Sequence, residues 1–257
     1  MILLEEFDET KTAVINPNNM VERIPNMPKI AIACFSHILF EKIVSGGKCS
    51  KITELNNTNL RKEIYEIEYK QNKFAIFMMS IGAPAASADI EELHALGVEK
   101  FIVFGNCGVL DSSIEDCSVI IPTEALRDEG TSFHYQKPSK SIKLNTKYMN
   151  EFKEILDNLN FKYTEGISWT TDAFYRETQK KIEERKKSGA IVVEMESAAL
   201  QAVANFRQVD LFIFFYAGDN LAAESWDKRS FLGDIKLDEK SQIAYLALEL
   251  ANKIKNV

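Results

Sequence analysis

The sequence predicts an α/β fold, a single domain with a central mixed sheet flanked by helices. Short apolar runs of strand length recur along the chain, and helical patterns lie between several of them. The apolar runs are continuous rather than alternating, which is typical of strands that are covered on both faces. Strands interleaved with helices favour a mainly parallel sheet between helical layers.

The elements follow in order along the chain. Residues 1–28 are expected to form an N-terminal arm, with turn signals at "NPNN" and "IPNMP", and residues 29–257 to form the domain. Strands are expected at 29–35, 73–82, 100–108, 118–126, 190–195 and 209–218. Helices are expected at 84–96, 146–158, 176–187, 197–206 and 240–255. No internal repeat or interdomain linker interrupts this pattern.

Composition narrows the class of protein. With 31 basic and 38 acidic residues the net charge is −7, which disfavours a nucleic-acid or anionic-membrane partner. No apolar run approaches the length of a membrane span, and the acidic start "MILLEEFDET" does not resemble a signal peptide. The three histidines show no ligand spacing, so no metal site is expected. We expect a cytoplasmic protein with reduced thiols at Cys34, Cys49, Cys107 and Cys117.

Ligands of such folds bind at the carboxyl ends of the strands. In "SIGAPAASADIEEL", Gly82 precedes a helix start, which suits close backbone approach and anion binding. In "FGNCGVLD", Gly105 and Asn106 follow a buried strand and suit a nest for an anion. The alternative for each stretch is an ordinary tight turn.

Two further strand ends carry aromatic and acidic side chains. "ISWTTDAFYRET" (167–178) includes Phe174 and suits a wall for a flat ring, although such aromatics are more often core. Asp219 leaves the apolar strand "LFIFFYAG", where apolar walls raise a carboxyl pKa and suit a general acid. Capping of the next helix is the alternative role for Asp219.

The stretch "VVEMESAAL" places Glu194 and Glu196 inside an apolar run. An ionised carboxylate in such a setting is costly unless it is paired or hydrogen-bonded. The two carboxylates around this strand-to-helix junction suit hydrogen bonds from the hydroxyls of a sugar. The alternative is one solvated glutamate and one in an ion pair.

Together these stretches resemble the nucleoside phosphorylase family, which includes purine nucleoside phosphorylases, uridine phosphorylases and methylthioadenosine/S-adenosylhomocysteine nucleosidases. The matches "SIGAPAASADIEEL", "FGNCG", "RDEGTSFHY", "TTDAFY" and "VEMESAAL" fall in order between about residues 73 and 220. The resemblance implies that residues 29–257 are a catalytic domain. It also implies a homo-oligomer, either a dimer or a hexamer.

The resemblance also implies roles for single residues. Met195 and Glu196 would bind ribose, Phe174 would stack on the base, and Asp219 would protonate the purine ring as the glycosidic bond breaks. Gly82, Gly105 and Asn106 would contact phosphate. Uridine-specific members use a Gln-x-Arg pair where this chain has Thr178 and Lys180, which favours a purine.

The implied enzyme is a purine nucleoside phosphorylase with phosphate as co-substrate, no cofactor and no metal. This chain departs from the family at the phosphate site. Val103 stands where the phosphorylases have an arginine, and "ACFSH" (33–37) replaces a Gly-Asp-Pro-x-x-Arg-like loop. Arg61 of a second copy is one possible substitute. Hydrolysis by water and nucleoside binding without turnover stay open, whereas a nicotinamide dehydrogenase is disfavoured by the missing GxGxxG.

Overall fold

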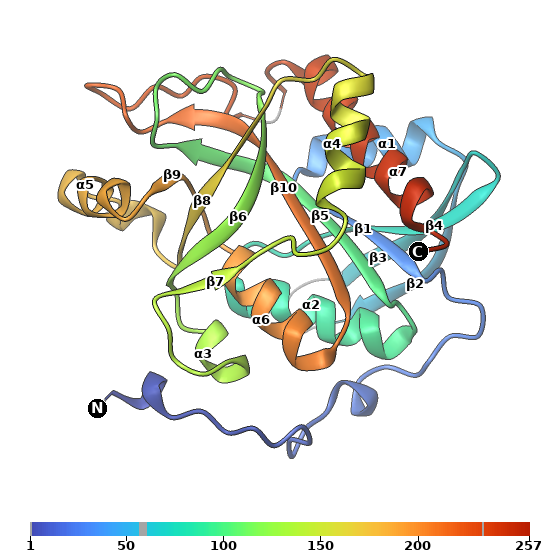
Figure 1. Cartoon of the computed structure of the whole chain (residues 1–257). Coiled ribbons are helices and arrows are strands. Elements are labelled where there is room, and N and C mark those ends of the chain that lie inside the picture. Colours follow the sequence, from blue (N-terminus) through green and yellow to red (C-terminus); the bar gives the residue numbers. More distant parts are fainter. Residues whose placement is uncertain (1, 57–60, 233) are drawn as a thin grey trace.

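The computed structural model describes residues 2–56, 61–232 and 234–257, which form one mixed sheet with helices on both faces (Figure 1). The strands are β1 (Ile30–Cys34), β2 (Cys49–Asn56), β3 (Arg61–Tyr69), β4 (Asn72–Met78), β5 (Lys100–Val109), β6 (Val119–Asp128), β7 (Ser141–Lys143), β8 (Tyr163–Thr171), β9 (Ala190–Glu194) and β10 (Asp210–Asn220). The α-helices are α1 (His37–Gly46), α2 (Ala83–Leu96), α3 (Ser132–Tyr135), α4 (Met149–Asn158), α5 (Gln179–Lys187), α6 (Ser197–Arg207) and α7 (Leu237–Ile254). Short 3-10 helices are η1 (Leu3–Glu5), η2 (Pro17–Asn19) and η3 (Phe174–Arg176).

Five of the strands form a closed ring. The sheet order is β10-β6-β8-β9-β5-β1-β4-β3-β2, and β10 also pairs with β5, so β5, β10, β6, β8 and β9 close on themselves. Strands β1, β4, β3 and β2 extend the sheet from β5, and β7 pairs with β6. Five described pairings are parallel and five antiparallel, so the sheet is mixed as predicted but not mainly parallel.

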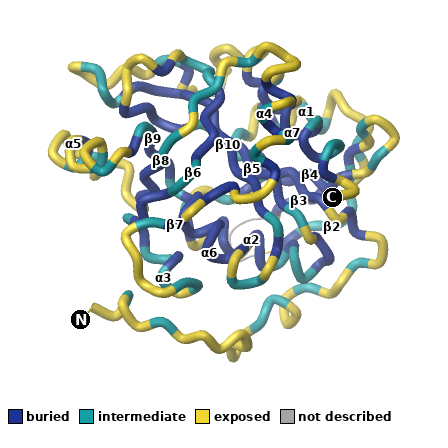
Figure 2. The backbone as a smooth tube through the Cα atoms, in the orientation of Figure 1, coloured by how far each residue is buried: buried dark blue, intermediate teal, exposed yellow. Residues whose placement is uncertain are grey.

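Two hydrophobic cores cover the two faces of the sheet, which accounts for the continuous apolar runs. Helices α2 and α6 pack on one face through residues such as Leu93 and Val203, and Val103 of β5 points into the same core. Helices α4 and α7 pack on the other face, where the next residue of β5, Phe104, contacts their core. Neighbouring residues of a strand point to opposite faces, so both must be apolar here. The strands are accordingly buried along most of their length (Figure 2).

Each predicted strand and helix has a counterpart in the structure, and the predicted α/β class is confirmed. Strands β2, β3, β7 and β8 and helices α1 and α3 were not predicted. In β3 the sequence "RKEIYEIEY" alternates, with Ile64 and Ile67 buried between more exposed residues, because this antiparallel strand lies near the edge of the sheet. In β8 the buried positions include Thr170, a polar residue that a search for apolar runs overlooks.

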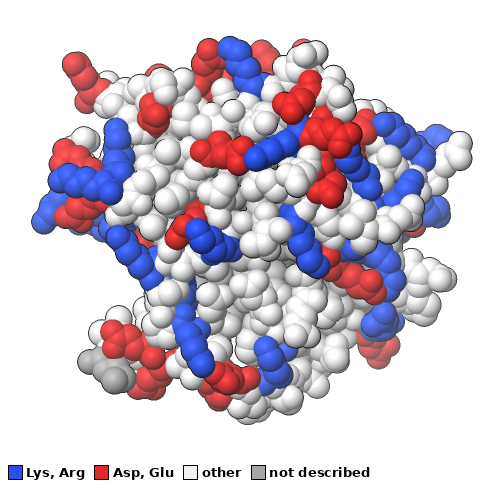
Figure 3. Space-filling view, viewed as in Figure 1, with Lys and Arg blue, Asp and Glu red and all other residues white. Residues whose placement is uncertain are grey.

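The N-terminal segment lies on the surface of the molecule. Residues 2–28 run along the outside of the molecule and are largely exposed (Figures 1 and 2). The Nζ of Lys11 donates to the carbonyl of Phe206 over 2.8 Å, which ties this segment to the end of α6. Figure 3 shows basic and acidic side chains interspersed over one face. Within the described ranges, no helix has the length and apolar character needed to cross a bilayer.

Candidate active site

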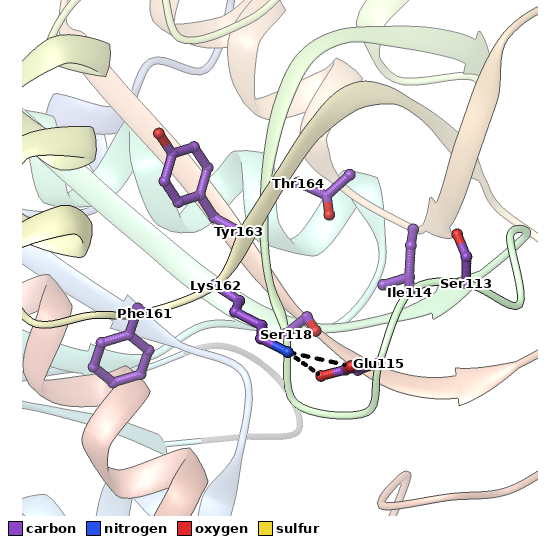
Figure 4. A pocket seen from close by; sticks show the side chains of 8 residues that line it. All are labelled: Ser113, Ile114, Glu115, Ser118, Phe161, Lys162, Tyr163 and Thr164. Atoms are coloured by element: carbon purple, nitrogen blue, oxygen red, sulfur yellow. Dashed lines mark hydrogen bonds and ion pairs between the residues drawn. The ribbon is translucent and has the colours of Figure 1, made fainter.

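A cavity of about 700 Å³ lies where the carboxyl-terminal ends of β5, β9 and β10 meet. The segment that precedes α5 and the one that follows β10 complete its wall. A smaller pocket of about 350 Å³ is shown in Figure 4; Lys162 there pairs with Glu115 at 3.2 Å. Because none of the predicted site residues lines the smaller pocket, the larger cavity is the candidate active site.

The register of the ring brings the acidic side chains together. Gly108 of β5 pairs with Asp219 of β10 on one side and with Val193 of β9 on the other. A Cβ atom at Gly108 would lie 2.4 Å from Cδ1 of Leu221 and 3.2 Å from Oδ1 of Asp219. A side chain at Gly108 would therefore push the side chain of Leu221 aside and press on Asp219.

Glu194, at the end of β9, is a structural acceptor. Its Oε2 accepts from the amides of Glu196 and Ser197, each at 2.7 Å. Its Oε1 accepts from the hydroxyls of Thr170 at 2.6 Å and Ser197 at 2.5 Å. These four hydrogen bonds replace the water that burial removes, and two of them satisfy free amides at the start of α6.

Glu196 differs from its neighbour because it faces the cavity with few partners. Its Oε1 accepts a hydrogen bond from the backbone amide of Gly82 over 2.6 Å. No side chain of the described residues forms a hydrogen bond with this carboxyl. Burial, together with the nearby charge of Glu194, raises the pKa of Glu196 to about 8. Gly82 is held at φ +93°, a conformation that favours glycine, at the turn that begins α2.

Asp219 lines the cavity, and among the described residues no side chain donates a hydrogen bond to its Oδ1. Trp226 donates its Nε1–H to Oδ2 over 2.7 Å, and an indole nitrogen can only donate, so Oδ2 is an acceptor and a proton would sit on Oδ1. Burial raises the pKa of Asp219, and the hydrogen bond from Trp226 opposes this effect in part. The geometry therefore suits a carboxylic acid that can give up a proton.

The other predicted residues fall into two groups. Asn106, Met195 and Phe174 line the cavity, and Phe174 packs on Tyr175 with ring centroids 3.9 Å apart. Gly105 does not line it: like the rest of the expected strand at 100–108 it belongs to β5, where a Cβ at Gly105 would lie 2.8 Å from the ring of Phe35. Because β5 pairs with β10 through these residues, they form a strand and not a tight turn, and contact of Gly105 and Asn106 with phosphate stays a prediction.

The electrostatics of the lining oppose an anion. Among the described residues that line the cavity, five are acidic and none is Lys, Arg or His. The acidic residues are Glu177, Glu194, Glu196, Asp219 and Glu224. Val103, at the position of the missing arginine, is fully buried in the core under α2 and α6 and contributes nothing to the cavity.

Glu177 and Trp226 are among the cavity side chains that the sequence analysis missed. Glu177 lies between η3 and α5, and it was passed over because a single glutamate among charged residues resembles a solvated surface. Trp226 follows β10 in the segment "NLAAESWDK", where nothing in the local pattern marks a contact with Asp219. The only hint in the sequence that Trp226 contacts Asp219 is that this rare residue type occurs seven residues after the candidate acid.

Comparison with known families decides the assignment. The sequence model of the phosphorylase superfamily matches residues 29–251, nearly the whole chain after the N-terminal segment. The chain belongs to the phosphorylase superfamily. Membership confirms the resemblance to the family that the sequence motifs indicated.

Relatives within the superfamily differ in the nucleoside that their names state. A guanosine phosphorylase of Halorubrum lacusprofundi is 26% identical over 190 residues, or 74% of this chain and 78% of that protein. A uridine phosphorylase of Thermococcus kodakarensis is 28% identical over 151 residues, or 54% of each chain. A crystal structure of purine nucleoside phosphorylase from Toxoplasma gondii has the same fold, with a TM-score of 0.78, 17% identity, and coverage of 90% of this chain and 94% of that one.

The described residues hold no group of three or more His, Cys, Asp or Glu side chains that could bind a metal ion. The four cysteines are free; Cys107, which lines the cavity, is buried, and burial raises the pKa of its thiol well above the ordinary value. A buried thiol of this kind is a poor nucleophile. The carboxyl groups of the described lining are therefore better candidates for proton transfer than this thiol.

Proposed function

We propose that this chain cleaves the N-glycosidic bond of a purine nucleoside, with phosphate as co-substrate, to give free base and ribose 1-phosphate. The observation that carries the proposal is that Glu196 and Asp219, two buried carboxyls, line one cavity in a member of the phosphorylase superfamily. The proposed enzyme is a cytoplasmic homo-oligomer, a dimer or a hexamer, that needs no cofactor or metal.

The sugar half of the reaction is assigned to Glu196 and Met195. As the glycosidic bond breaks, positive charge develops on the ribose ring, and the enzyme must stabilise this state more than the ground state. Glu196 would accept hydrogen bonds from the ribose hydroxyls through the oxygen that Gly82 leaves free. Met195 would pack against the sugar beside it.

The base half is assigned to Asp219 and Phe174. Negative charge develops on the departing base, and a proton from Oδ1 of Asp219 to a ring nitrogen would neutralise it. Phe174 would stack on the base. A purine is favoured over uracil because Thr178 and Lys180 replace the Gln-x-Arg pair of uridine-specific relatives, although uridine phosphorylases are also among the relatives of this chain.

A phosphate nucleophile would depend on neutral donors in the described lining. Asn106 lines the cavity and its side-chain amide can donate to phosphate, but Gly82 gives its amide to Glu196 and Gly105 lies outside the lining. A neutral donor is roughly half as strong as a charged one. The absence of cations among the described lining residues favours hydrolysis by water as a second candidate.

The test is the release of free base, followed by chromatography, from inosine, adenosine, guanosine and uridine in phosphate buffer. Release from a purine nucleoside supports the proposal, whereas tight binding of all four without release would indicate a binding protein. Glu196→Gln should then impair ribosides more than 2′-deoxyribosides, by about 1.5–3 kcal/mol in transition-state stabilisation. Equal losses on both sugars would contradict the assignment of Glu196.

A further inference from the structure

A buried ion pair is hydrogen-bonded to the turn that joins β4 to α2, residues 79–82. Lys62 of β3 and Asp89 of α2 are each 5% exposed, and the ammonium group of Lys62 pairs with the carboxylate of Asp89. Burial lowers the pKa of Lys62, and the charge of Asp89 opposes this effect. Taking two charges out of water is costly, and apolar side chains of similar volume often give an equally stable fold. Stability by itself therefore does not explain a charged pair at this place.

Both members of the pair hold Ser80, which lies in that turn. The Nζ of Lys62 donates to Oγ of Ser80 over 2.7 Å. The backbone amide of Ser80 donates to Oδ2 of Asp89 over 2.8 Å. Hydrogen bonds to charged groups are stronger than neutral ones, so the side chain and the backbone of Ser80 are both firmly held.

Gly82, in the same turn, connects it to the candidate active site. Its amide donates to Oε1 of Glu196 over 2.6 Å, and its carbonyl accepts from the amide of Ala86 over 3.0 Å in the first turn of α2. The place of Gly82 thus depends on Ser80 before it and on α2 after it. Asp89 joins these two supports, because it stands on α2 and binds the amide of Ser80.

We propose that Lys62 and Asp89 are positioning residues for Glu196: by holding Ser80, they place the amide of Gly82 against the carboxyl that would bind ribose. A hydrogen bond weakens steeply when its donor is displaced or turned, and binding groups have to be held within about 0.5 Å of their working geometry. This inference rests on the proposed function for the role of Glu196 toward ribose. The effect on the Glu196 carboxyl itself can be measured without a substrate.

The test replaces the pair by apolar side chains in Lys62→Met/Asp89→Ala, so that no buried charge is left without its partner. Burial and the charge of Glu194 raise the pKa of Glu196, and the amide of Gly82 opposes them because it stabilises the ionised form. Loss of that hydrogen bond should therefore raise the pKa of Glu196 from about 8 to about 9.

NMR of protein labelled with 13C at the glutamate carboxyls measures this pKa, and the signal of Glu196 is the one absent from Glu196→Gln. Glu194 and Asp172, whose charges also act on Glu196, are unchanged in the double variant. Lys62→Met/Asp89→Asn restores an acceptor for the amide of Ser80 and should return the pKa of Glu196 to about 8.

The matched control is Arg207→Met/Glu91→Ala. Glu91 is also a buried residue of α2, and its Oε2 accepts from Nε of Arg207 over 2.6 Å, but this ion pair joins α2 to the end of α6. Its removal should leave the pKa of Glu196 unchanged. Ser80→Ala is a milder variant that keeps the Lys62–Asp89 pair, and it should raise the pKa of Glu196 in the same direction. Circular dichroism and melting temperatures verify that each variant is folded.

Kinetics supply a second measurement. Lys62→Met/Asp89→Ala should lower kcat/KM for a purine riboside about 10- to 100-fold, the scale expected for a misplaced binding group. In the background of Glu196→Gln the same two substitutions should cost less than about threefold more, because their effect passes through Glu196.

The outcomes separate this proposal from the proposed function. If the pKa of Glu196 rises, the Asn variant reverses it and the control does not change it, but the wild type cleaves no nucleoside, the positioning role stands without the reaction. If nucleosides are cleaved but the pKa is the same in Lys62→Met/Asp89→Ala and wild type, or shifts equally in the control, the positioning role is overturned and the proposed function stands. Equal losses of kcat/KM with and without Glu196→Gln also overturn it. Should the double variant not fold, an unchanged pKa in Ser80→Ala overturns it.

Discussion

Glu194 and Glu196 are two residues apart in sequence, yet their carboxyl groups have different numbers of hydrogen-bond donors around them. Four donors surround Glu194, so its charge is satisfied by the protein. Glu196 receives one amide, from Gly82, and keeps acceptor capacity for a ligand. The number of donors around each carboxylate distinguishes the structural residue from the candidate ribose ligand.

Asp219→Asn tests the proposed general acid. An asparagine side chain keeps the shape of Asp219 but cannot supply the acidic proton, so kcat for a purine nucleoside should fall about 10²- to 10⁴-fold. Binding of the substrate should change far less, and steady-state kinetics with calorimetric binding measure the two separately. Turnover equal to that of the wild type would exclude Asp219 from the mechanism.

Glu196→Gln also has a predicted effect on the stability of the ligand-free protein. The raised pKa of Glu196, about 8 against 4.5, means that the folded state binds more protons than the unfolded state between these values. The free energy of unfolding contributed by this group therefore falls as pH rises from about 4.5 to 8. The variant should gain on the order of 3 kcal/mol relative to the wild type at pH 8, and almost nothing at pH 4.

Urea unfolding at a series of pH values measures this difference. Glu183→Gln, at an exposed position, should show no comparable trend. A stability difference between Glu196→Gln and wild type that does not vary with pH would mean that folding does not shift the pKa of Glu196.

At the scale of elements, the junction of β9 and α6 holds the site together. Ser197 begins α6, and its amide and hydroxyl both bind Glu194, while Thr170 of β8 binds the same carboxylate. The hydroxyl of Thr170 also accepts from the amide of Ala198 at 3.1 Å. One carboxylate thus caps a helix and joins two neighbouring strands of the ring to it.

Glu194→Ala should therefore destabilise the whole fold, not only the site. Removing the acceptor leaves buried amides and hydroxyls without partners, at a cost of about 2–4 kcal/mol in the free energy of unfolding. Chemical denaturation measures it, with Glu183→Ala as a control expected within about 0.5 kcal/mol of wild type. A loss below 1 kcal/mol would show that water replaces the missing carboxylate.

At the scale of the whole molecule, the ring of β5, β10, β6, β8 and β9 brings acidic side chains to one cavity. The described lining of this cavity contains no Lys, Arg or His. Phosphate entering such a cavity meets repulsion and only neutral donors. We therefore expect phosphate to bind weakly, with half-saturation at roughly 1 mM or above, the upper end of common substrate constants.

The measurement is base release with phosphate withheld and then titrated, together with identification of the sugar product. Ribose 1-phosphate that forms only with phosphate supports phosphorolysis, and free ribose at an unchanged rate without phosphate supports hydrolysis. Micromolar saturation would contradict the expectation and indicate a cation from elsewhere. Arg61, at the exposed start of β3, would then be replaced by alanine to test whether a second copy supplies it.

The sequence by itself determined the α/β class, the principal strands and helices, and the family. Continuous apolar runs such as that around Val103 and Phe104 predict strands without a structure. Neighbouring residues of such a strand point to opposite faces of the sheet, and both faces are buried, so both residues must be apolar. Asp219 and Glu196 were found as candidates because an acid at the end of an apolar strand stands out locally. Their catalytic roles stay predictions.

Only the tertiary structure decided which groups meet. The closing of the ring depends on β5 pairing with both β9 and β10, and no local pattern around Gly108 encodes that register. The tertiary structure also engaged the amide of Gly82 with Glu196, left Gly105 out of the cavity lining, and placed Glu177 in the cavity with Asp219. Local sequence fixes which residues are buried, whereas partners far apart in the chain fix the hydrogen bonds and charges that each buried group meets.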